Sequence, residues 1–76
     1  VKILNEKLVD RATRIVSEIS DLPYGESAKI LEESGRDVPL AILIALTGAK
    51  KEECEKILKK NRGNIRLSLK ELGGVS

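Results

Sequence analysis

The sequence predicts an all-α fold, a small bundle of about five helices in one domain over residues 1–76. Three observations support this prediction. Apolar residues recur at spacings of three and four along the first twenty positions, a central nine-residue stretch is apolar apart from one proline, and two glycine-containing turns each separate a pair of helical patterns. We therefore expect one long helix followed by two related helical hairpins.

The first helix is predicted from about Asn5 to Ser20, within a long connecting segment over residues 1–20. Asn5 is a suitable N-cap, and Leu4 and Val9 are placed to form a hydrophobic staple across it. Its apolar stripe consists of Leu4, Leu8, Ala12, Ile15, Val16 and Ile19.

The central helix is predicted from Val38 to Leu46. Asp37 can cap its start, Pro39 fits the first turn, and Gly48 can end it in a left-handed conformation. A helix that is apolar on all sides must be buried on most of them. Nine residues fall far short of the ~20 needed to span a membrane, so we expect this helix to be the centre of a soluble bundle.

A shift of 27 residues lays Tyr24–Ile42 over Lys51–Leu69. Five pairs are then identical: Glu26 and Glu53, Lys29 and Lys56, Ile30 and Ile57, Leu31 and Leu58, Leu40 and Leu67. The pattern predicts one helical hairpin over residues 24–48 and a second over residues 51–72, each with a glycine in its turn. The second hairpin is less apolar, so its closing helix should lie on the outside, against the central helix.

Composition excludes several classes of function. Fourteen Lys and Arg against twelve Asp and Glu give a net charge of +2, and this balance disfavours a nucleic-acid-binding face. With one cysteine and no histidine, we expect no metal site, no cofactor and no catalytic residue in these 76 positions. A lone cysteine is compatible with the cytoplasm. The chain begins with Val1 and has no Met, so we expect an excised piece of a longer protein.

Three further features favour structural interpretations. Cys54 precedes Ile57 and Leu58 by three and four residues, so we expect it to be buried in the core. Tyr24 is expected to cover one end of the core. The basic cluster Lys50, Lys51, Lys56, Lys59 and Lys60 alternates with glutamates, which favours a salt-bridged helix face over a phosphate or RNA site.

Asn5 and Lys7 are the candidate binding residues. An amide and an ammonium group beside the exposed N–H groups of a helix start could together hold a phosphate or a sugar hydroxyl. Judged on the residues alone, an N-cap and a solvated lysine explain both, and this simpler interpretation is favoured.

The chain resembles the C-terminal region of the N-acetylmuramic acid 6-phosphate etherase family, which is related to glucokinase regulatory proteins. The resemblance covers essentially the whole chain. The segments that carry it are Asn5–Ala12 with Arg14–Val16, Leu31–Gly35, Val38–Gly48 and Asn61–Arg66.

The resemblance implies a homodimeric parent enzyme that cleaves the D-lactyl ether of its substrate to N-acetylglucosamine 6-phosphate and D-lactate, in bacterial cell-wall recycling. It also implies that the catalytic glutamates lie in a preceding sugar-isomerase-type domain. The present chain would cap the sugar-phosphate site of that domain, in the same or the partner subunit, with Asn5 and Lys7 as contacts.

The sequence departs from the family pattern at helix ends. Pro23 and Gly25 replace capping and acidic residues, so the second helix is expected to start late or fray. Lys50 replaces another cap, Cys54 a small alanine, and Arg36 or Arg62 one glycine of a Gly-Gly-Asn turn.

The glycine-turn hairpins resemble those of ubiquitin-associated-type bundles, so the expected fold is ubiquitin-associated-like and the alternative function is an interaction module of that type. Against this alternative, the turn Ser34–Asp37 lacks the aromatic residue that such modules often carry after the glycine. A small nucleic-acid binder is a third possibility, which the near-balanced charge disfavours.

Overall fold

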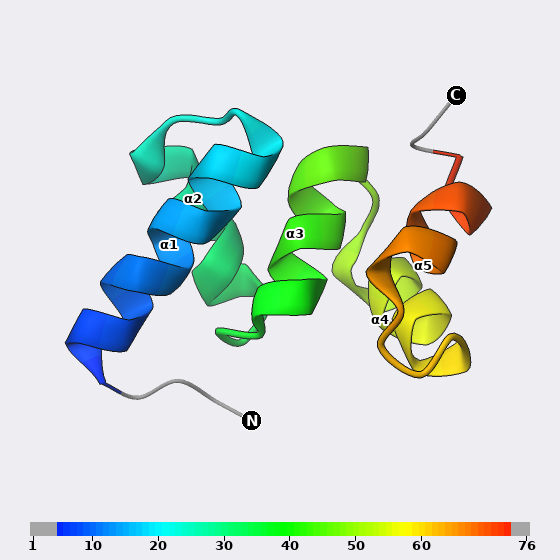
Figure 1. The fold of residues 1–76 in the computed structure, drawn as a ribbon. Coiled ribbons are helices and arrows are strands. Elements are labelled where there is room, and N and C mark those ends of the chain that lie inside the picture. The colour runs from blue at the N-terminus through cyan, green and yellow to red at the C-terminus, as the bar shows by residue number, and fades with distance from the viewer. Residues whose placement is uncertain (1–4, 74–76) are drawn as a thin grey trace.

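The computed structural model describes residues 5–73, which form five α-helices and no strand (Figure 1). The helices are α1 (Glu6–Ser20), α2 (Tyr24–Glu33), α3 (Val38–Thr47), α4 (Lys51–Lys60) and α5 (Ile65–Glu71). The all-α prediction is confirmed. Closer likeness to ubiquitin-associated domains stays a prediction.

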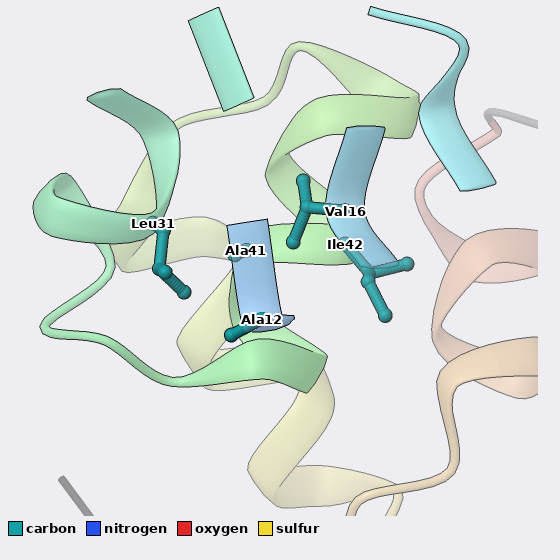
Figure 2. Packing of buried hydrophobic residues seen from close by; sticks show 5 residues of the cluster. All are labelled: Ala12, Val16, Leu31, Ala41 and Ile42. Carbon is teal, nitrogen blue, oxygen red and sulfur yellow. The ribbon is translucent and has the colours of Figure 1, made fainter. Parts of the chain in front are cut away.

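Helix α3 lies at the centre and contacts each of the other four helices (Figure 1). The Asp37 side chain caps it by accepting the Leu40 N–H at 3.3 Å, and Gly48 ends it with a φ of 71°. One apolar cluster joins α3 to α1 and α2 through Ala12, Val16, Leu31, Ala41 and Ile42 (Figure 2). A second cluster joins it to α4 through Leu40, Leu43 and Cys54. The central apolar helix α3 therefore contributes to both apolar clusters.

The apolar stripe of α1 is only partly buried. Ala12 and Val16 are buried, but Leu8, Ile15 and Ile19 are 49%, 45% and 50% exposed. The stripe is thus wider than the surface that α2 and α3 cover. The proposed staple involves Leu4, which lies outside the described residues.

The two hairpin turns share two backbone hydrogen bonds and a side-chain cap at equivalent positions. In the first turn the N–H groups of Gly35 and Arg36 donate to Glu32 and Leu31 at 3.0 and 2.8 Å. The same two bonds recur 27 residues later, and the Asp37 cap is matched by a side-chain cap at the same spacing. These later interactions are Arg62 to Lys59 at 3.1 Å, Gly63 to Leu58 at 2.9 Å, and the Asn64 cap on the Leu67 N–H at 3.0 Å. The internal repeat therefore extends to backbone geometry.

Helix α2 begins at Tyr24, directly after Pro23, so the expected late start is wrong. No side chain caps α2, but the Pro23 carbonyl accepts the Ser27 N–H at 3.0 Å and completes the first turn. Proline suits this place because its missing N–H would have had no partner at a helix start. Helix α4 likewise begins after Lys50 without a side-chain cap.

Candidate functional site

Asn5 and Lys7 lie together at the exposed start of α1. Asn5 has an extended backbone, with φ −82° and ψ 127°, and its Oδ1 atom accepts the Lys7 N–H at 2.8 Å. This is the N-cap that the sequence predicted. Both residues are exposed, so the cap leaves the Asn5 amide nitrogen and the Lys7 ammonium group facing solvent.

The cap limits what Asn5 can offer a ligand. Its oxygen already has a partner, so the side chain is available as a donor through Nδ2. Together with the ammonium group of Lys7 and the positive end of the α1 dipole, that donor suits an anionic or hydroxyl-bearing ligand. Whether the two residues bind one stays a prediction.

One turn further along α1, Asp10 ties the helix to α2. The Tyr24 hydroxyl donates to Asp10 Oδ1 at 2.5 Å, and Arg14 Nε donates to Asp10 Oδ2 at 3.1 Å. The hydrogen bond from Tyr24, followed by the charge of Arg14, lowers the pKa of Asp10. The same bond raises the pKa of Tyr24.

The expectation that Tyr24 covers the core is wrong, because it is 48% exposed and bonded to Asp10 instead. Fourteen residues separate the two side chains, so no local spacing rule pairs them. The only signal in the sequence was a single tyrosine at the first position of the predicted hairpin.

Cys54 is fully buried, as predicted. Its Sγ atom lies 4.0 Å from Thr47 Oγ1, and burial raises the pKa of the thiol. A raised pKa lowers the thiolate fraction at neutral pH, so the structure favours packing over reactivity.

The basic cluster of α4 does not form a salt-bridged face. Among residues 5–73, only Lys60 of this cluster has an ion pair, and its partner is Glu71 on α5 at 2.8 Å. Asn61 Nδ2 donates to the other oxygen of Glu71 at 2.7 Å. This pairing joins the ends of α4 and α5 and lowers the pKa of Glu71.

A hollow of about 400 Å³ separates the start of α3 from the end of α4, at Asp37, Lys59 and Arg62. Its lining mixes both signs of charge and does not include Asn5 or Lys7. In the described part of the chain, no three His, Cys, Asp or Glu side chains are grouped to hold a metal ion. None of the helices there is both long and apolar enough to cross a membrane.

The chain is similar in sequence to curated N-acetylmuramic acid 6-phosphate etherases. It is 39% identical over 72 residues to the protein of Trichodesmium erythraeum, which covers 95% of this chain and 24% of that relative. It is 42% identical over 69 residues to the one of Microcystis aeruginosa, 91% of this chain and 22% of the relative. It is 41% identical over 61 residues to the one of Lactobacillus acidophilus, 80% of this chain and 20% of the relative.

The chain therefore spans about a quarter or less of the length of these relatives. The resemblance identified in the sequence is confirmed. No protein-family model matches the chain. No solved structure matches it either.

Proposed function

Because the chain corresponds to a segment of the N-acetylmuramic acid 6-phosphate etherases, we propose that it is the C-terminal helical domain of such an enzyme. The parent is a cytoplasmic lyase of bacterial cell-wall recycling that cleaves the D-lactyl ether, giving N-acetylglucosamine 6-phosphate and D-lactate. The observation that carries this proposal is 39–42% identity to three etherases over 80–95% of the chain.

In this proposal the domain caps the sugar-phosphate site of a sugar-isomerase-type catalytic domain. Asn5 and Lys7 are its contacts with the substrate. The exposure of both side chains, the free amide of Asn5 and the dipole at the start of α1 support this role. Because we propose a homodimeric parent, the capped site belongs to the same or to the partner subunit.

The role of Lys7 is tested in the complete enzyme with the Lys7→Ala variant. Loss of one charge-assisted hydrogen bond to the phosphate should raise KM about tenfold or more. The Lys56→Ala variant is the control, because Lys56 is an exposed lysine on α4, far along the chain. The free energy of unfolding should be nearly unchanged in both variants. An unchanged KM for Lys7→Ala removes this lysine from the site.

Asn5 needs a substitution that separates capping from binding. Aspartate caps helices as well as asparagine does, but it has no amide donor and repels phosphate. Asn5→Asp should therefore keep the stability of α1 and still raise KM. Asn5→Ala should lower the stability by about 1 kcal/mol as well. If Asn5→Asp leaves KM unchanged, Asn5 is a cap only.

A further inference from the structure

An apolar groove of about 340 Å³ lies between α1, α3 and α5. Five of its six lining side chains are apolar: Ile19, Ile42, Leu46, Ile65 and Leu69. The sixth is Arg66. Figure 1 shows α1 and α5 on either side of α3, so α3 forms the floor and the other two helices form the walls.

The apolar surface continues from the groove along α1. Leu8, Ile15 and Ile19 are spaced by seven and four residues, which places them on one side of the helix. They are 49%, 45% and 50% exposed, and at ~1.5 Å per residue the row is about 16 Å long. Single exposed apolar residues are ordinary, but a row beside an apolar groove indicates a binding surface.

Cations flank this surface on both walls. Arg11 lies between Leu8 and Ile15 on α1. Arg66 and Lys70 are four residues apart on α5, so they lie on one side of that helix. None of these three cations has an ion-pair partner among residues 5–73. Glu18 is an acidic residue beside Ile19 and lies seven residues after Arg11, on the same flank of α1. It offsets one of the three cations, so the surroundings remain net positive.

The positive flanks decide between two kinds of occupant. A second copy docked through the same face would bring its own arginines against these ones, and like charges across an interface are unfavourable. A segment with carboxylates beside an apolar face would be attracted on both sides. An amphipathic helix of about three turns would match the length of the row.

We propose that this surface, the groove with Leu8 and Ile15, binds an acidic amphipathic helix from the remaining three quarters of the etherase polypeptide. The inference rests on the proposed function and specifies how the domain is held against the rest of the enzyme. Leu67 provides a matched reference position. It is 49% exposed, like Ile19, but lies about 160° around α5 from Leu69 and outside the groove.

The test compares maleimide labelling of Ile19→Cys and Leu67→Cys in the 76-residue chain and in the complete polypeptide that contains it. The native thiol of Cys54 is fully buried and serves as an unreactive reference. Both introduced thiols should react at similar rates in the short chain. In the complete polypeptide, Ile19→Cys should react about tenfold more slowly if the groove is about nine-tenths occupied, with Leu67→Cys unchanged.

Charge reversal tests the acidic character of the occupant. Arg66→Glu should restore fast labelling of Ile19→Cys in the complete polypeptide, because two like charges would then face each other. Lys56→Glu on α4 is the control and should leave the labelling slow. If Arg66→Glu has no effect, the occupant is not acidic at this position and the proposal is wrong.

Other outcomes separate this inference from the proposed function. Fast labelling of Ile19→Cys in a polypeptide that cleaves the lactyl ether overturns the docking surface alone. Slow labelling in a polypeptide without that activity supports the surface and overturns the proposed function. Slow labelling of the 76-residue chain that is relieved by dilution assigns the groove to a second copy, against the proposal.

Discussion

The two helical hairpins share one pattern but differ in how much of it they bury. Leu40 on α3 and Leu67 on α5 occupy equivalent places, each the third residue after its capping side chain. Leu40 is 2% exposed, whereas Leu67 is 49% exposed. The difference arises because α3 has helices on both sides, whereas the main contacts of α5 within residues 5–73 are with α3 and α4. A repeated sequence pattern therefore predicts repeated backbone geometry without predicting repeated burial.

Small residues at equivalent positions of the two hairpins, in contrast, are buried to the same extent. Ser27 and Cys54 are equivalent, as are Ala41 and Ser68, and all four are fully buried. A small side chain at these positions lets neighbouring helices approach closely in both hairpins. Their polar groups differ, however. Ser68 Oγ donates to the Asn64 carbonyl at 2.8 Å and accepts from Asn61 Nδ2 at 3.2 Å, whereas Ser27 Oγ has no hydrogen-bond partner in the described structure.

The largest expected difference is between Leu40→Ala and Leu67→Ala. Removing a buried leucine side chain and leaving a cavity should lower the free energy of unfolding by about 3 kcal/mol at Leu40. The same change at half-exposed Leu67 should cost less than about 1 kcal/mol. Urea unfolding of the two variants measures both values. Equal losses would show that α5 is covered as fully as α3.

The paired serines should respond with opposite signs. Ser27→Ala removes a buried hydroxyl without a partner, so it should raise the free energy of unfolding by about 1 kcal/mol. Ser68→Ala leaves Asn61 without one of its acceptors and should lower it by about 1 kcal/mol. Thermal unfolding of both variants under one condition tests this. A loss of stability on Ser27→Ala would imply a partner for its hydroxyl.

The elements of the fold follow from local sequence rules. Asn5 and Asp37 were predicted as N-caps, and each accepts a backbone N–H group in the first turn of its helix. Asn64 does the same at the start of α5. Gly48 was predicted to end α3 and does so in the left-handed conformation. These features depend on three or four neighbouring residues, which is the range over which spacing and capping patterns carry information.

The features that sequence reasoning missed depend on tertiary contacts. Periodicity placed Leu8, Ile15 and Ile19 on the apolar side of α1, but it cannot say how much of that side neighbouring helices cover. The bond between Tyr24 and Asp10 was missed for the same reason. For the candidate site, the sequence predicted the cap at Asn5. The residues left a binding role for Asn5 and Lys7 as the less favoured interpretation, and the family resemblance is what favoured it.

The two hairpin turns differ in the order of glycine and arginine, which is Gly35-Arg36 in the first and Arg62-Gly63 in the second. Both positions of each turn have positive φ: Gly35 at 77° and Arg36 at 62° in the first, Arg62 at 54° and Gly63 at 85° in the second. A left-handed conformation costs a non-glycine residue ~1 kcal/mol or more. A Cβ at Gly35 or Gly63 would meet nothing within 4 Å, so backbone conformation and not space calls for glycine.

Arg62→Gly should therefore raise the free energy of unfolding by about 0.5–1 kcal/mol. Glycine removes the strain of the left-handed conformation, and the greater conformational freedom of glycine in the unfolded chain offsets part of that gain. Arg36→Gly should gain less, because Arg36 Nε donates to Glu32 at 2.9 Å and that ion pair is lost. Chemical denaturation of the two variants compares them. A larger gain at Arg36 than at Arg62 would contradict this account.

The smallest expected effects concern two carboxylates that join neighbouring helices. Asp10 on α1 bonds to Tyr24 on α2, and Glu71 on α5 pairs with Lys60 on α4. Both have a lowered pKa in the folded chain, Asp10 chiefly through Tyr24 and Glu71 chiefly through Lys60 and then Asn61. A carboxylate with a lowered pKa stabilises the fold at any pH above its ordinary pKa, which is 3.8 for Asp10 and 4.5 for Glu71. This stabilisation is lost as the pH falls through the pKa of the folded state. Stability should therefore decline on acidification, less steeply in Glu71→Gln and in Tyr24→Phe.

Salt should distinguish the two carboxylates. The main partner of Asp10 is a neutral hydroxyl, whereas that of Glu71 is the Lys60 ammonium group. At about 1 M salt, screening between exposed charges is nearly complete, so the acid sensitivity due to Glu71 should shrink more than that due to Asp10. Comparing the pH dependence of unfolding of Glu71→Gln and Tyr24→Phe at low and high salt measures each contribution. If salt suppresses both equally, Asp10 is held by Arg14 rather than by Tyr24.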